Sequence, residues 1–211
     1  MIRKAIVSGI WLALLTQAPA AKGPARLKPG TVAPDFTVRT TDGKDRNLAT
    51  LRDEKRPRIL VVVFWSPTCP WSRAWCAELS KIAKEFDSKN VRVVAVDSND
   101  PNNKDADNNA DSAKDVARFA KEKSLAFEVY FDSDQKAADL FGAQTTPDVF
   151  VIGLDGKIAY TGRVNDMQNP AKPADFKKSF LRNALEQLVA NKSVPESVTP
   201  PAGFGIRRPK K

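Results

Sequence analysis

Two periodicities of hydrophobic and polar positions alternate along the chain and predict an α/β protein. Alternating or continuous apolar runs predict strands at 35–39, 59–65, 91–96, 127–131, 148–152 and 157–163. Apolar positions spaced three and four apart predict helices from 70 to about 86, near 113–123, at 135–141 and over 174–191. We therefore expect a central mixed sheet flanked by helices, with an N-terminal β-hairpin turning at 41–44.

The two ends of the chain differ from its middle. Residues 1–20 combine Arg3 and Lys4 with a mostly apolar run of 11 residues, Ala5–Leu15, and end in Ala18-Pro19-Ala20, the pattern of a signal peptide cleaved after Ala20. The run is too short for a membrane span, so we expect a periplasmic or secreted protein. We predict a linker at 21–27, one domain at 28–191 and a proline-rich basic tail at 192–211 that is loosely ordered.

The net charge of +9 does not predict a nucleic-acid partner, because residues 1–20 contribute +2 and residues 192–211 contribute +4. The chain contains no histidine, which removes the commonest metal ligand and general base. We expect neither a metal site nor a cofactor, and no stable membrane span once the signal is removed.

The candidate nucleophile is Cys69, which follows the apolar run 59–65 and precedes a predicted helix. The N–H groups and the dipole at a helix start favour a thiolate, and Pro70 suits the first helical position. We expect an exposed, activated sulfur. The alternative is a buried, inert cysteine that fills core volume.

Several segments resemble one family in the correct order. The segment Phe64–Ser72 is similar to the active site of thioredoxin-like proteins, especially the exported redoxin (AhpC/TSA, peroxiredoxin-like) branch, here with a Cys-Pro-Trp-Ser site. The segments Pro29–Phe36, Thr145–Phe150 and Leu154–Arg163 resemble other parts of that branch. The resemblance implies a thioredoxin-like fold.

The resemblance also implies roles for particular residues. Cys69 corresponds to the attacking cysteine and Pro147 to a cis-proline that faces it, although a trans bond is the usual state of an X-Pro peptide. Thr146 would offer backbone hydrogen bonds to an extended substrate. The remaining residues expected to contact substrate are Pro70, Trp71 and Ser72.

Two departures from the family pattern concern turnover. Ser72 replaces the second cysteine of the usual C-x-x-C, and a hydroxyl cannot resolve a mixed disulfide. Cys76 lies two helical turns from Cys69, too far for a disulfide while the helix is intact. It could resolve the intermediate after partial unwinding, or it could be a core residue, since it falls on the apolar stripe.

Three hypotheses for the function follow. The first is a monothiol thiol–disulfide oxidoreductase in which Cys69 attacks disulfides or oxidised thiols of proteins or small molecules, and an external thiol or Cys76 releases the product. The second is a thiol peroxidase with antioxidant activity, although Ser66 stands where the peroxiredoxin signature has threonine. The third is a binding module of the same fold without turnover.

Overall fold

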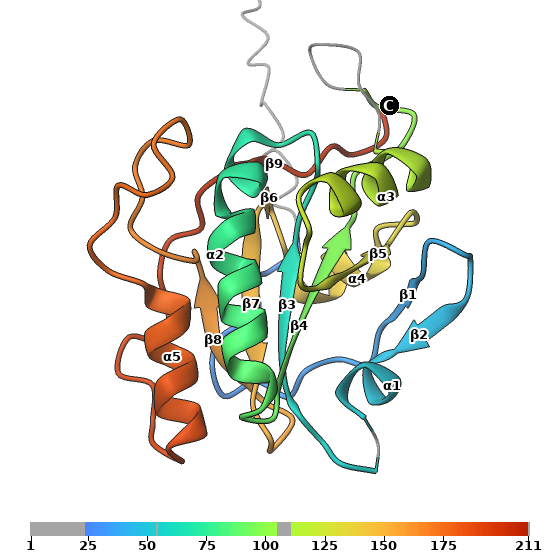
Figure 1. Ribbon diagram of the computed structural model, residues 1–211. Coiled ribbons are helices and arrows are strands. Elements are labelled where there is room, and N and C mark those ends of the chain that lie inside the picture. Colours follow the sequence, from blue (N-terminus) through green and yellow to red (C-terminus); the bar gives the residue numbers. More distant parts are fainter. Residues whose placement is uncertain (1–23, 54, 105–110, 211) are drawn as a thin grey trace, which may run out of the picture.

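The central feature of the fold is a mixed sheet with helices on both faces (Figure 1). The computed structural model describes residues 24–53, 55–104 and 111–210. Within them a seven-stranded sheet has the order β2-β1-β5-β4-β3-β7-β8. Its strands are β1 (Thr37–Arg39), β2 (Asp45–Asn47), β3 (Ile59–Phe64), β4 (Val91–Asp97), β5 (Glu128–Phe131), β7 (Asp148–Ile152) and β8 (Ile158–Gly162).

The middle of the sheet is built from apolar strands buried on both faces. All six residues of β3 are buried, and β3 pairs in parallel with β4 and antiparallel with β7. β4 continues in parallel to β5. Because strands covered on both faces have no polar side, the continuous apolar run 59–65 predicts this central position correctly.

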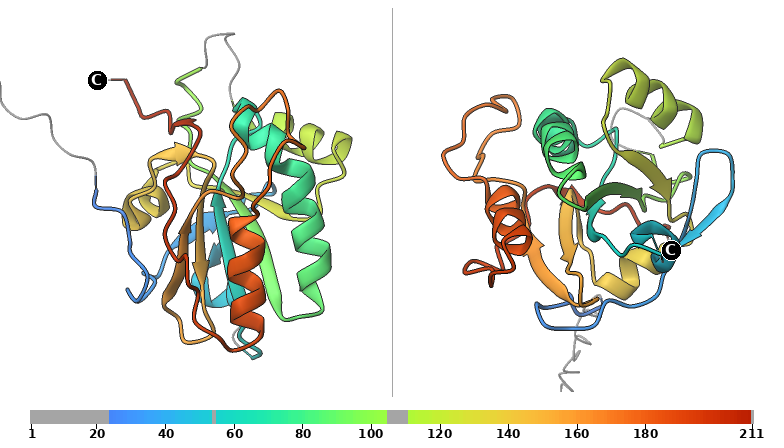
Figure 2. Two further views of the ribbon diagram at one scale, coloured as in Figure 1. Left: turned by 90° about the vertical axis from the view of Figure 1, so that its left-hand side faces the viewer. Right: turned by 60° about the horizontal axis from the view of Figure 1, so that its bottom comes forward.

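Helices from two groups cover the two faces. The first face packs against α2 (Pro70–Asp87), α3 (Ala113–Glu122) and α5 (Phe180–Val189), and the second against α1 (Leu48–Arg52) and α4 (Lys136–Phe141). In Figure 1 the first group lies in front of the sheet, and Figure 2 gives its side view. The expected α/β architecture is thereby confirmed.

The last helix is shorter than its apolar spacing predicts. It begins at Phe180 instead of near 174. The amides of Lys177 and Lys178 donate to Asp166 Oδ1, at 2.8 and 3.0 Å. Because these amides bond to a side chain and not to helix carbonyls, the segment before Ser179 stays outside the helix. A distant carboxylate therefore decides the helix start, which periodicity cannot show.

The prediction of a loosely ordered tail is wrong. The amide of Thr161 in β8 donates to Ser197 O, and the amide of Thr199 donates back to Thr161 O, each at 3.0 Å. Further on, β9 (Phe204–Gly205) pairs antiparallel with β6 (Thr145–Thr146), and the side chain of Ile206 is buried. In Figure 1 this red segment crosses the upper end of the sheet from the side of α5 towards α3. The tail packs on the domain because the sheet edges supply partners for its backbone.

Candidate active site

Cys69 lies where the central strand β3 leads into α2. It is the N-cap residue of α2, with extended backbone angles, and Pro70 is the first helical residue. The amide of Arg73 donates to Cys69 O at 3.0 Å, which is the first hydrogen bond of the helix. The expected position at a helix start is therefore observed, and Pro70 loses no hydrogen bond there.

The thiol of Cys69 faces the segment that precedes β7. Its Sγ donates to the backbone carbonyl oxygen of Thr146 at 2.8 Å. The Thr146–Pro147 peptide bond is cis, as the family resemblance implies. The structure therefore brings together Cys69, Thr146 and Pro147, three of the residues expected from the sequence.

The prediction that the sulfur of Cys69 is exposed is wrong, because only 4% of the residue is accessible. Its sulfur nevertheless contacts a backbone oxygen of another segment, and the residue sits at a helix start. The site is thus buried and polar, in contrast to the core position of an inert cysteine.

The three other residues expected to contact substrate differ in accessibility. Pro70 is exposed and Trp71 is half-buried, with its ring 5.5 Å from that of Trp75. Ser72 is fully buried, and its Oγ accepts a hydrogen bond from the amide of Ser66 at 3.3 Å. Ser72 thus stabilises the turn before Cys69 from inside, and its hydroxyl does not reach the surface where a substrate would lie.

A buried carboxylate organises the loop before Cys69. Asp111 accepts hydrogen bonds from the hydroxyls of Ser66 and Thr68, both at 2.8 Å, and from Asn99 Nδ2 at 2.7 Å. The Arg207 guanidinium lies 3.1 Å from the same carboxylate and donates to Thr68 Oγ1 at 2.9 Å. A buried charge needs such partners, and here they come from three separate segments of the chain.

A second carboxyl group adjoins this network at the end of β4. Asp97 Oδ1 accepts from the amide of Asn99 at 3.1 Å, and Oδ2 is buried without a hydrogen-bond partner among the described residues. Burial, followed by the nearby negative charge of Asp111, raises the pKa of Asp97 well above its usual range. The acid is therefore favoured in its neutral form, in which it can donate a hydrogen bond.

The sequence did not identify Asp111, Asn99 or Arg207 as site residues. They lie 42, 30 and 138 positions from Cys69, respectively, and no motif spacing connects them to it. A polar loop after β4 and an arginine pair at 207–208 are the signals in the sequence. Only the observed topology, in which β4 lies beside β3 and the tail crosses both, brings them together.

Cys76 lies in the apolar interface between α2 and the sheet. Both cysteines are free thiols. Burial raises the pKa of the Cys76 thiol to about 11, and its Sγ lies 3.2 Å from Ser72 O, as expected for a residue in an intact helix. These observations favour the core role that the sequence left open for Cys76.

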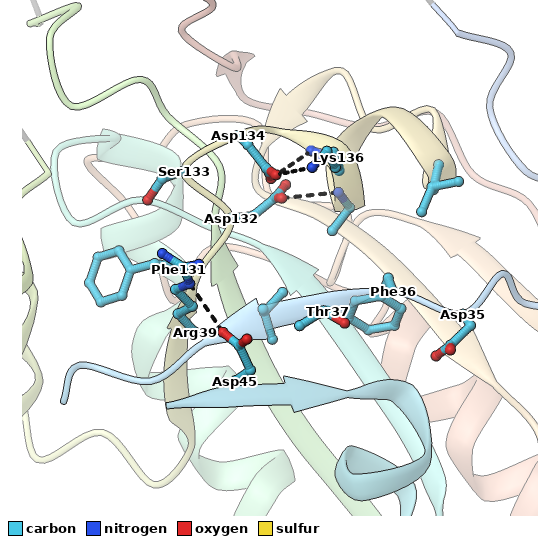
Figure 3. A pocket seen from close by; sticks show the side chains of 13 residues that line it. Asp35, Phe36, Thr37, Arg39, Asp45, Phe131, Asp132, Ser133, Asp134 and Lys136 are labelled. Atoms are coloured by element: carbon cyan, nitrogen blue, oxygen red, sulfur yellow. Dashed lines mark hydrogen bonds and ion pairs between the residues drawn. The ribbon is translucent and has the colours of Figure 1, made fainter. Parts of the chain in front are cut away.

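The structure has a pocket away from Cys69, and its lining does not favour an active site. It has a volume of about 580 Å³ and lies beside β1, β5 and α4 (Figure 3). Four of its charged groups form two ion pairs: Arg39 with Asp45 at 3.1 Å, and Lys136 with Asp134 at 2.7 Å. Asp132 accepts from two backbone amides of α4. No residue predicted for the active site lines this pocket.

Among the described residues, no group of three or more histidine, cysteine, aspartate or glutamate side chains is arranged to hold a metal ion. In the same residues, none of the helices combines the length and the apolar character needed to span a bilayer. The predicted signal peptide at 1–20 lies outside the described residues.

Comparison with known proteins places this geometry in a family. The model of the AhpC/TSA family matches residues 29–161, which include Cys69 and Pro147. The chain belongs to this family. The observed sheet order, the cis-proline segment and the solved structures that match agree on a thioredoxin-like fold, as the sequence predicted.

Relatives of this AhpC/TSA protein include a thiol-disulfide oxidoreductase and a peroxiredoxin. The thiol-disulfide oxidoreductase ResA of Bacillus subtilis (strain 168) is 26% identical over 160 residues, 72% of this chain and 81% of that protein. The chloroplastic peroxiredoxin Q of Gentiana triflora is 26% identical over 171 residues, 76% of this chain and 69% of that protein. The crystal structure of the hypothetical protein SMc02350 from Sinorhizobium meliloti 1021 has a TM-score of 0.76 and 26% identity, and the match covers 89% of this chain and 98% of that one.

Proposed function

We propose that this protein is an exported monothiol thiol–disulfide oxidoreductase of the redoxin type, with Cys69 as its nucleophile. The observation that carries the proposal is the position of Cys69 Sγ, at the start of α2 and 2.8 Å from Thr146 O beside cis-Pro147. A thiolate is the attacking species in disulfide exchange, and a helix start stabilises it. The relative named thiol-disulfide oxidoreductase supports this reaction class.

The reaction has two balanced steps. The Cys69 thiolate attacks one sulfur of a disulfide, a mixed disulfide forms, and the other sulfur leaves as a thiolate that takes a proton from water. An external thiolate then attacks the substrate sulfur of the mixed disulfide, and Cys69 leaves as the thiolate. The net result is the exchange of one thiol for another in the substrate disulfide.

The second step is assigned to an external thiol for a structural reason. The raised pKa of Cys76 keeps its thiol protonated at neutral pH, and the intact helix separates it from Cys69. Ser72 offers only a hydroxyl. The mixed disulfide should therefore persist until an external reductant arrives.

This persistence provides the test. Incubation with an extract of exported proteins and with small disulfides should leave mixed disulfides on Cys69 of the wild type, and none on Cys69→Ser; mass spectrometry distinguishes protein adducts from small-thiol adducts. Ser72→Cys places a second thiol at i+3, within disulfide range, and should release most of the trapped partners without added reductant. If the wild type forms no mixed disulfide with either, the disulfide-exchange proposal is wrong, and peroxide reduction or a binding module of this fold is left.

A second candidate reaction is peroxide reduction, supported by the relative named peroxiredoxin Q. The Cys69 thiolate would attack a peroxide oxygen, the O–O bond would break, and a sulfenic acid and an alcohol or water would form. An external thiol would then reduce the sulfenic acid. Consumption of hydrogen peroxide in the presence of a thiol, at a rate that Cys69→Ser abolishes, would identify this activity.

The cellular location is also part of the proposal. Residues 1–20 have the basic start, apolar run and Ala-Pro-Ala end of a cleaved export signal. A periplasmic or extracellular location would supply disulfide substrates. Mass spectrometry of the secreted protein should find an N-terminus at Ala21.

A further inference from the structure

The backbone edge beside the cis-proline is already occupied by this chain. β9 pairs antiparallel with β6, so that Thr146 lies opposite Phe204 and Thr145 lies opposite Gly205. The amide of Ile206 extends the pairing by donating to Gln144 O at 3.0 Å. An extended peptide that added to this edge would need the same backbone groups. We call residues 199–208 the C-terminal strap.

The strap lies directly against the cis peptide bond. Gly203 has a φ of 152°, and a Cβ placed on it would lie 2.1 Å from Thr146 O and 2.9 Å from Pro147 N. Any other residue at 203 would push the strap off β6. Gly205, two residues on, has room, since its Cβ would meet only Gln144 O at 3.9 Å.

The strap is anchored beside the site, on the hydrogen-bond network of Asp111 that organises the loop before Cys69. The Arg207 guanidinium pairs with buried Asp111 at 3.1 Å, and the Arg207 amide donates to Asn99 Oδ1 at 2.8 Å. Ile206 is buried in the second core cluster. Directly at the site the strap is held less firmly, since β9 has two residues and Phe204 is 58% exposed.

We propose that the C-terminal strap determines substrate size: it keeps extended peptides off the β6 edge and leaves Cys69 to react with small thiol reagents and small disulfides. This inference rests on the proposed disulfide exchange at Cys69. A peptide can replace β9 strand for strand once the strap has left, because the incoming strand would restore the same backbone pairing. A small disulfide needs no partner on β6, so displacement of the strap should affect it much less.

Two probes with the same leaving group test the proposal. One is a ten-residue peptide whose central cysteine is disulfide-linked to 2-nitro-5-thiobenzoate, and the other is cysteine carrying the same group. Attack by the Cys69 thiolate on the cysteine sulfur breaks the S–S bond and releases the coloured thiolate in both. The ratio of the two second-order rate constants measures discrimination by size.

Gly203→Ala and Gly205→Ala form a matched pair of variants. Gly203→Ala introduces the clash with Thr146 and should raise the rate with the peptide probe roughly tenfold, the effect of about 1.4 kcal/mol of strain. The rate with the small probe should change less than twofold. Gly205→Ala should leave both rates at the wild-type values. Hydrogen exchange at residues 203–206 verifies that the strap has been released.

A second variant covers the case in which Gly203→Ala does not fold. Ile206→Ala removes the buried apolar anchor of the strap, leaves the Asp111 network in place, and should raise the peptide-to-small ratio in the same direction. Equal increases with both probes would mean that the strap is a general cover and would overturn the proposal, as would an unchanged ratio in a variant with a released strap. If Cys69 of the wild type fails to react even with the small probe, the proposed exchange reaction itself is wrong.

Discussion

Helix α2 has one cysteine at its start, Cys69, and a second two turns further along, Cys76. The two side chains have different surroundings. Cys69 is 4% exposed and Cys76 is 5% exposed, so accessibility does not separate them. Cys69 donates to Thr146 O from the start of the helix. Cys76 lies about 10.5 Å further along the axis, in the apolar cluster under α2. Position at the helix start and contact with another segment, and not exposed area, separate the proposed nucleophile from the packing residue.

The physical difference lies in what can stabilise a negative charge on sulfur. The start of a helix presents N–H groups without partners in the helix and the positive end of its dipole. In the body of the helix those groups are already bonded, and burial raises the pKa of Cys76 to about 11. The same residue type in the same helix therefore has two different electrostatic environments.

The largest effect we expect is in the alkylation of the two thiols. At neutral pH, a thiol with a pKa of about 11 has roughly 300-fold less thiolate than a free cysteine, so Cys76 should react with iodoacetamide slower by about that factor. Cys69 should react first. Peptide mapping by mass spectrometry after timed quenching measures both rates, and the urea-unfolded protein, in which they should converge, is the control. Similar rates in the folded protein would contradict the comparison.

A smaller effect is expected on the pH dependence of stability, through Asp148. This residue follows the cis-proline and is fully buried next to Arg26. Burial raises its pKa to about 6 from an ordinary value of 3.8. The folded protein then binds this proton more tightly than the unfolded chain. The carboxyl therefore contributes most stability below about pH 4, and the contribution is lost as the pH rises through 6, by about 3 kcal/mol.

Asp148→Asn should remove this dependence. Urea unfolding at pH 4 and pH 7 should show that the wild type loses about 2 kcal/mol relative to the variant between the two values, because at pH 4 part of the unfolded carboxyl is already ionised. The exposed Asp42 is a control, because its pKa is lowered to about 2, first by the hydrogen bond from Thr40, and its replacement should shift the dependence in the opposite direction. A constant difference between wild type and Asp148→Asn would show that this end of the sheet does not perturb the carboxyl.

Local patterns predict the parts of this molecule that local forces determine. The run 59–65 predicts β3 because burial on both faces leaves a continuous apolar stretch, and Cys69-Pro70 predicts the start of α2. The fold class and the position of Cys69 at a helix start could therefore be inferred from the sequence.

Contacts across long sequence distances could not be inferred in this way. β6 and β9 have two residues each and lie about 60 positions apart, so neither produces a periodic signal. The burial of Cys69, the partners of Asp111 and the ordered tail all depend on such contacts. The proline content of the tail favoured disorder, but the edges of β8 and β6 provide hydrogen-bond partners that composition does not reveal.

The smallest effect we expect concerns the packing role of Cys76. Cys76→Ala should lower the free energy of unfolding by about 1 kcal/mol, because a buried sulfur is lost from the interface between α2 and the sheet. The rate at which Cys69 forms mixed disulfides, and the lifetime of those disulfides, should not change. If Cys76 instead resolved the intermediate, the variant would accumulate mixed disulfides that the wild type releases. Quantifying trapped species in the two proteins by non-reducing electrophoresis therefore decides whether the second cysteine takes part in the reaction or only in the core.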